Sequence, residues 1–125
     1  MKRIAISELE GATLNRAVLI AIGGELDEDL SHSGMVFGTW DDLANSERFD
    51  PGSDWSQCGP LIERYRLSIG LDSDENMRVQ WVAAADEVRP FYMGDSLLTA
   101  ACRAIVAAHN PSGYVDVPLG LVEGE

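Results

Sequence analysis

Basic residues are scarce in this sequence, which has nine Lys and Arg against 21 Asp and Glu and a formal net charge of −12. Because a surface this acidic repels phosphate, direct binding to nucleic acid is not expected. The negative charge is compatible with a different role, in which the chain acts as an acidic decoy of nucleic acid and binds a basic host protein.

Long hydrophobic runs are also missing. The longest apolar run, Ala17 to Ile22, is far shorter than the about 20 residues that a membrane helix needs. Near the start, Lys2 and Arg3 are followed by Glu8 before any apolar stretch of the kind found in secretory signals. We therefore expect a cytoplasmic protein without membrane association.

Cysteine and histidine each occur only twice. Cys58, Cys102, His32 and His109 are too widely spaced to form the close ligand pairs of a structural zinc site, so no metal or other cofactor is expected. Free thiols are expected because a chain of this length can build its own core, and a disulfide between Cys58 and Cys102 is the alternative.

The length of 125 residues, with 46% hydrophobic and 24% charged residues, is typical of one soluble folded domain. We expect a single monomeric domain over 1–125. Its ordered part is expected to cover about 1–118, with a frayed tail at the C-terminus.

Two segments have the apolar period of an amphipathic helix. The first spans 10–22, with Ser7 at the spacing of a capping box. The second is capped by Asp95 or Ser96 and ends at Asn110. Both helices are expected to place their apolar faces on the core.

A hairpin at about 64–84 is predicted from two runs of alternating polar and apolar residues around an acidic turn. The turn, 72–76, resembles the start of a calcium loop, but Met77 stands where such a loop requires glycine, so a solvated turn is expected. One face of the hairpin is predicted to lie against the core, namely Leu67, Ile69, Leu71, Val79 and Trp81.

Shorter strands are expected at 35–40 and 115–118. Between the first of these and the hairpin, 41–59 reads as a long polar loop because proline and glycine interrupt it. These elements predict an α+β fold, with two helices packed on one face of a small antiparallel sheet around a central hairpin.

The stretch SDWSQCGPLIERY, at 53–65, holds the densest set of candidate residues. We interpret it as a corner in which Asp54 and Ser53 cap a turn, the Trp55 ring is buried, and Gly59-Pro60 bends the chain. Because a long polar loop leads into this corner, we take six residues as the candidate binding site: Asp54, Trp55, Gln57, Cys58, Gly59 and Pro60.

No catalytic residue is assigned. Cys58 lies in a predicted turn, and the sequence identifies neither a histidine nor a helix N-terminus that would activate its thiol. A small hydrolase or redox enzyme that uses Cys58 therefore stays as an alternative to a noncatalytic protein.

Three blocks of the sequence resemble the NinX family of lambdoid-phage and prophage proteins, which also occurs in bacterial genomes such as those of Burkholderia. The blocks lie at 7–21, 53–64 and 98–103, and the middle one is the most specific because its Asp-Trp, Gln, Gly-Pro and Ile-Glu stand in the family's order. Cys58 departs from the family, which tends to have a second glycine there. The resemblance implies a small cytoplasmic, phage-linked protein and assigns it no catalytic residues.

These observations favour a noncatalytic accessory or interaction module of phage or prophage origin. We expect it to bind a protein partner, not identified by the sequence, through the 41–60 loop and the surface around Trp55. The Cys58 enzyme and the acidic decoy remain the two alternatives.

Overall fold

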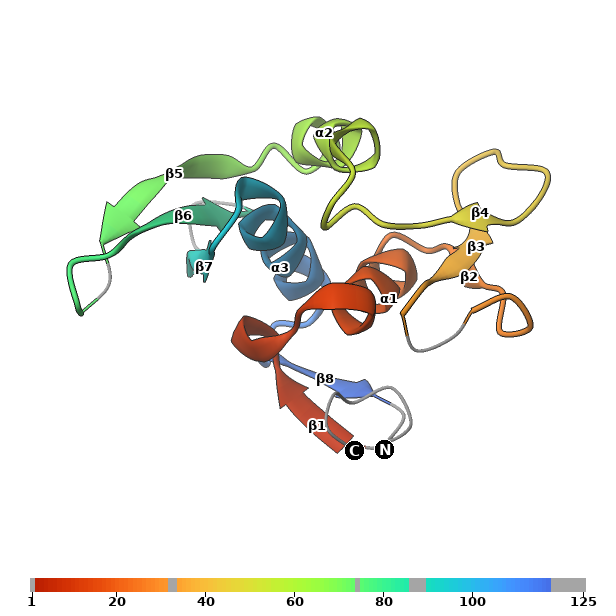
Figure 1. The fold of residues 1–125 in the computed structure, drawn as a ribbon, viewed down its shortest axis with the longest axis horizontal. Coiled ribbons are helices and arrows are strands. Elements are labelled where there is room, and N and C mark those ends of the chain that lie inside the picture. Colours follow the sequence, from red (N-terminus) through yellow and green to blue (C-terminus); the bar gives the residue numbers. More distant parts are fainter. Residues whose placement is uncertain (1, 32–33, 74, 86–89, 118–125) are drawn as a thin grey trace.

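The computed structural model describes residues 2–31, 34–73, 75–85 and 90–117. Within these ranges the chain forms three α-helices, one short 3-10 helix and three antiparallel sheets (Figure 1). The α+β class is confirmed. The predicted arrangement had two helices on one sheet, and the structure has one more helix and two more sheets within these ranges. The expected frayed tail after 118 and the ligand candidate His32 lie outside the described residues.

Helix α1 (Gly11–Ala21) occupies the segment that its apolar period predicts and buries Leu14, Val18 and Leu19. The predicted capping box is wrong, because Ser7 lies in the 3-10 helix η1 (Ile6–Glu8) and Glu10, the N-cap residue, makes no side-chain capping bond. The amide of Leu9 donates to the carbonyl of Ile6 at 3.1 Å, and this tight turn takes Ser7 away from the start of α1.

Helix α3 (Leu97–His109) is the centre of the fold, and α1, α2 (Trp55–Arg64) and the hairpin sheet all pack against it (Figure 1). The predicted N-cap is confirmed, since the hydroxyl of Ser96 accepts a hydrogen bond from the amide of Thr99 at 3.1 Å. Alanines at 100, 101, 104 and 107 are all buried, and their small side chains let the neighbouring elements approach closely on several sides.

The strands form three separate sheets. In the first, β1 (Lys2–Ala5) pairs with β8 (Tyr114–Val117), which confirms a strand close to the C-terminus of the described chain. The second has the order β2-β3-β4 and consists of β2 (Glu25–Leu26), β3 (Phe37–Thr39) and β4 (Glu47–Arg48). The third has the order β5-β6-β7 and consists of β5 (Ser68–Ser73), β6 (Val79–Ala84) and β7 (Tyr92–Gly94).

The predicted hairpin is confirmed as β5 and β6, with Leu71 opposite Trp81. Its predicted core face is wrong over the outer half of the hairpin. Leu67 and Trp81 pack against the buried residues of α3, but Ile69, Leu71 and Val79 are 43%, 60% and 65% exposed. For Leu71 and Val79 the reason is geometric, because the hairpin extends beyond the end of α3 and its tip has no helix above it (Figure 1). Ile69 lies opposite the buried Ala83, but on the edge strand β5.

The predicted long loop at 41–59 is also wrong from Glu47 onward. Strand β4 and the first turns of α2 occupy this part, and Phe49 and Pro51 between them are buried. The chain therefore approaches the candidate site along a path that the core fixes.

Candidate functional site

Asp54 caps α2, and the other five candidate residues lie among the first six residues of this helix and not in a bend. Asp54 is the N-cap, and its carboxylate accepts hydrogen bonds from the amide and the hydroxyl of Ser56 at 2.9 and 2.6 Å. This carboxylate satisfies an amide that the first helical turn leaves without an intrahelical acceptor. The predicted capping role of Asp54 is thus confirmed, but the cap opens a helix.

Gly59 and Pro60 lie inside α2, which corrects the bend predicted for this pair. Proline at this position removes the hydrogen bond that its amide would donate to the carbonyl of Ser56. Both Ser56 and Pro60 are exposed, so water can reach that side of the helix. The cost of an interior proline is smaller there than in a buried helix.

The predicted burial of Trp55 is overturned, because its side chain is 58% exposed on the first turn of α2. The indole folds back along the helix, and a methyl group added at Gly59 would lie 3.4 Å from the indole nitrogen. That distance is an ordinary van der Waals contact, so the indole lies against the helix beside residue 59 while most of its surface stays in solvent.

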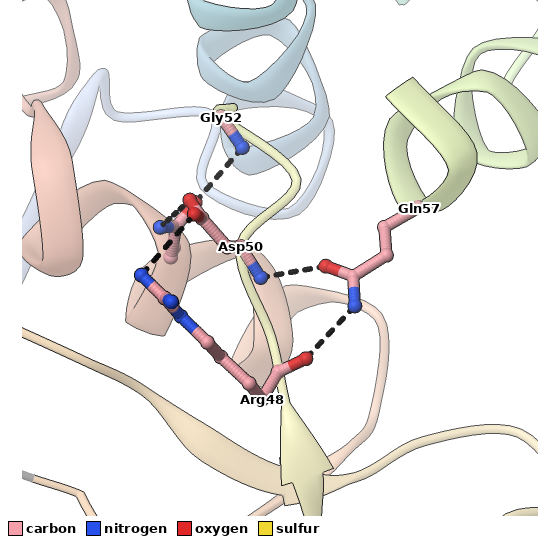
Figure 2. Close-up of polar contacts among 5 residues, drawn as sticks. Arg48, Asp50, Gly52 and Gln57 are labelled. Atoms are coloured by element: carbon pink, nitrogen blue, oxygen red, sulfur yellow. Dashed lines mark hydrogen bonds and ion pairs between the residues drawn. The ribbon is translucent and has the colours of Figure 1, made fainter. Parts of the chain in front are cut away.

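Gln57 joins α2 to the segment that follows β4. Its amide oxygen accepts from the amide of Asp50 at 2.6 Å, and its amide nitrogen donates to the carbonyl of Arg48 at 2.8 Å. Figure 2 shows this side chain reaching from α2 to the backbone of Arg48 and Asp50. Gln57 is thus a positioning residue: it fixes the first turn of α2, which carries Trp55 and is called the Trp55 turn below, to the end of β4.

Asn15 on α1 holds the same segment from the other side. This side chain is 6% exposed, donates to the carboxylate of Asp50 at 2.8 Å and accepts from the amide of Gly52 at 3.0 Å. Arg48 adds an ion pair to Asp50 at 3.6 Å (Figure 2). The sequence interpretation missed Asn15, although a polar side chain beside the apolar stripe of a helix is a signal for a buried hydrogen bond.

The far end of α2 is tied to its surroundings by two polar contacts. The hydroxyl of Tyr65 and Nε2 of His109 lie 2.9 Å apart, and partial burial raises the pKa of Tyr65. Arg64 pairs with Asp41 at 3.1 Å, but both side chains are more than half exposed, so this pair contributes little to stability. His109 is thereby placed at the C-terminal end of α3 and not beside a thiol.

Cys58 and Cys102 are both free and 0% exposed, and they face one another between α2 and α3. The hydrogen bond from the Cys102 thiol lowers the pKa of Cys58, and burial opposes this effect. The same hydrogen bond, together with burial and the nearby carboxylate of Asp50, raises the pKa of Cys102 well above its ordinary value. A hydrogen bond between two buried thiols is a packing arrangement, because both side chains are 0% exposed and no substrate reaches either sulfur in the folded state.

We therefore expect both thiols of the folded protein to react with a disulfide reagent at least about a hundredfold more slowly than in urea, since reaction requires local opening. Absorbance of the released thiolate gives the rate, and glutathione serves as the reference thiol. One fast equivalent in the folded protein would contradict the burial of Cys58. Two equivalents must appear after unfolding.

Other site types find little support in the described part of the chain. No group of three or more His, Cys, Asp or Glu side chains there is arranged to hold a metal ion. The helices in these ranges are all too short or too polar to cross a bilayer.

The comparison with known proteins identifies the family of this chain. No curated protein matches the chain. A family model described as Bacteriophage P22, NinX matches residues 5–109, and this range includes all three sequence blocks on which the resemblance depends. The site residues Asp54 to Pro60 and the supporting residues Asn15, Arg48 and Asp50 all lie within it. A match over this much of the sequence shows that the chain belongs to the phage NinX family.

Proposed function

We propose that this protein is a noncatalytic interaction module of phage or prophage origin that binds a protein partner through Trp55 and the first turn of α2. The observation that carries the proposal is an indole that is 58% exposed on a helical turn held by its own network of hydrogen bonds. Tryptophan is among the residues that most often dominate binding energy at protein interfaces.

The construction of this turn supports the proposal. Asp54 caps the helix, Gln57 fixes it to the backbone of Arg48 and Asp50, and the indole lies against the helix beside Gly59. A side chain presented on a rigid base loses less conformational entropy when a partner binds it. The surface is therefore suited to recognition without a large rearrangement.

The surroundings of Cys58 do not support the enzyme alternative. A nucleophile must be accessible to a substrate and activated by a base or a positive charge. Cys58 is buried against another thiol, and the imidazole of His109 is engaged with Tyr65.

The test is a pull-down from a bacterial lysate with the wild type, Trp55→Ala and Phe91→Ala. Phe91 is a matched control because it is also an exposed aromatic residue, at 57%, outside the candidate site. We expect a reproducible partner whose recovery falls at least about tenfold with Trp55→Ala, since truncating a central aromatic anchor costs about 2 kcal/mol or more. Recovery that Trp55→Ala leaves unchanged, in a variant with a native circular dichroism spectrum, would sink the proposal.

The acidic decoy is a second candidate function, favoured by one surface. Glu25, Asp27, Glu28 and Asp29 line an open groove of about 440 Å³ beside β2, and the chain carries a net charge of −12. Binding to a basic partner at such a surface must weaken as salt rises, because ions screen exposed charges. An affinity that stays flat between 50 and 300 mM salt, roughly a halving of the screening length or more, would exclude this candidate.

A further inference from the structure

The outer half of the β5-β6 hairpin has an apolar face without a covering element. Residues that oppose one another across an antiparallel pair share a face, so Ile69, Leu71 and Val79 lie on the same side as Trp81 and Ala83. Ala83 is buried under α3, whereas Leu71 and Val79 are 60% and 65% exposed. This face therefore continues the core-facing side of the sheet beyond α3.

Strand β5 also has an open edge. The sheet order is β5-β6-β7, and within the described ranges no strand pairs with the outer side of β5. Proteins protect such edges with proline, lysine, bulges or a covering loop. The six residues of β5, SIGLDS, contain neither proline nor lysine, and Asp72 is the one charge among them.

We propose that β5 pairs with β5 of a second copy of this chain, antiparallel and centred on Gly70, to form one continuous six-stranded sheet with the order β7-β6-β5-β5-β6-β7. This surface is separate from the Trp55 turn, and the proposal does not depend on that function. It replaces the monomer that the sequence analysis expects.

The sequence of β5 is self-complementary in this register. With Gly70 opposite Gly70 of the second copy, Ile69 faces the second copy's Leu71 on the apolar side, and this pair occurs twice by symmetry. Shifting the register by one residue would place the apolar face of one strand against the polar face of the other. A side chain added at Gly70 would meet nothing within 4 Å in the single chain, so the packing of the single chain does not require glycine at this position.

Charge favours the same register. Asp72 is opposite the second copy's Ser68, and a serine hydroxyl can donate to a carboxylate, so the two acidic side chains are kept apart. Two copies that each carry −12 repel at long range. Salt screens that repulsion beyond about 8 Å at physiological strength. Dimerisation should therefore strengthen as salt rises, which is opposite to the behaviour expected of the acidic decoy.

The test is sedimentation velocity on the full chain from low to high micromolar concentration, at low and moderate salt. We expect the mass to rise with concentration from 13.6 kDa towards twice that value. Leu71→Lys should weaken the dimer at least about tenfold, because it places a charge on the pairing edge. Met77→Lys is the matched control, since Met77 is 80% exposed in the turn of the same hairpin but outside β5.

Three results would overturn the proposal: a monomer at every concentration, a dimer that Leu71→Lys leaves intact, or a dimer that Met77→Lys weakens equally, which would indicate packing of faces. Amide hydrogen exchange of the wild type provides a test that needs no variant. The amides of β5 that point away from β6, which alternate along 68–72, should exchange at least about tenfold more slowly at the dimeric concentration than after dilution, and equal rates at these amides would also overturn pairing at this edge. The Trp55→Ala variant should dimerise as the wild type does.

Discussion

Replacing Phe49 by alanine is expected to lower the free energy of unfolding by about 3–5 kcal/mol, the range for removing a buried phenylalanine. Phe49 is 1% exposed, and its ring packs against Trp40 with 4.6 Å between the ring centroids. It stands between Arg48 and Asp50, the two residues whose backbone Gln57 holds. The cavity would therefore loosen the segment that leads into α2 as well as the core.

Urea denaturation followed by circular dichroism measures this effect, and the midpoint should shift without a large change in slope. Phe91→Ala is the control, because truncating an exposed phenylalanine should change stability by about 0.5 kcal/mol or less. The free energy of unfolding of a domain of this size is roughly 5–15 kcal/mol. The loss expected for Phe49→Ala is therefore a large fraction of the total stability. A loss below about 1 kcal/mol would show that Phe49 is not packed as described.

Replacing Asn15 by alanine is expected to lower the free energy of unfolding by about 2–4 kcal/mol. The variant loses a hydrogen bond to a carboxylate and leaves the amide of Gly52 without its acceptor, and each of these costs about 1–3 kcal/mol in a partly buried setting. Asn15 is the one buried polar side chain on α1 among the described residues. Its two bonds, to Asp50 and Gly52, link α1 to the corner before α2.

Asn45→Ala is the control, since Asn45 is exposed in the loop before β4. This substitution should change the free energy of unfolding by no more than about 0.5 kcal/mol. A double-mutant cycle of Asn15→Ala with Asp50→Ala isolates the side-chain pair, and a coupling energy of about 1 kcal/mol or more is expected for groups in one network. Coupling near zero would mean that the amide and the carboxylate do not support one another.

Local patterns were sufficient for helices α1 and α3 and for the β5-β6 hairpin. Apolar side chains in α1 and α3 repeat with the helical period, and the Ser96 cap is a contact between residues three apart. Such features depend on neighbours in sequence, so a single sequence carries them. The match to the NinX family over residues 5–109 likewise reflects residue order.

Helix α2 was missed because glycine and proline at 59 and 60 act as helix breakers in most contexts. Tertiary contacts overrule that preference here. Gln57 binds backbone groups of Arg48 and Asp50, and Cys58 and Leu61 are buried against the core, so the helix is stabilised by residues distant in sequence. The exposure of Trp55 does not follow from the helical period, because position 55 is three residues from the buried Cys58; it depends on which elements cover the first turn of α2.

The sequence alone therefore determined the class of fold, the two longest helices, the central hairpin and the family, because each is encoded by period, spacing or order along the chain. Only the tertiary structure decided which apolar residues are exposed at Trp55, Leu71 and Val79, and that Asn15 supports the candidate site. Burial depends on which elements lie above a residue, and hydrogen bonds such as Asn15 to Asp50 join positions far apart in the chain. No local pattern contains that information.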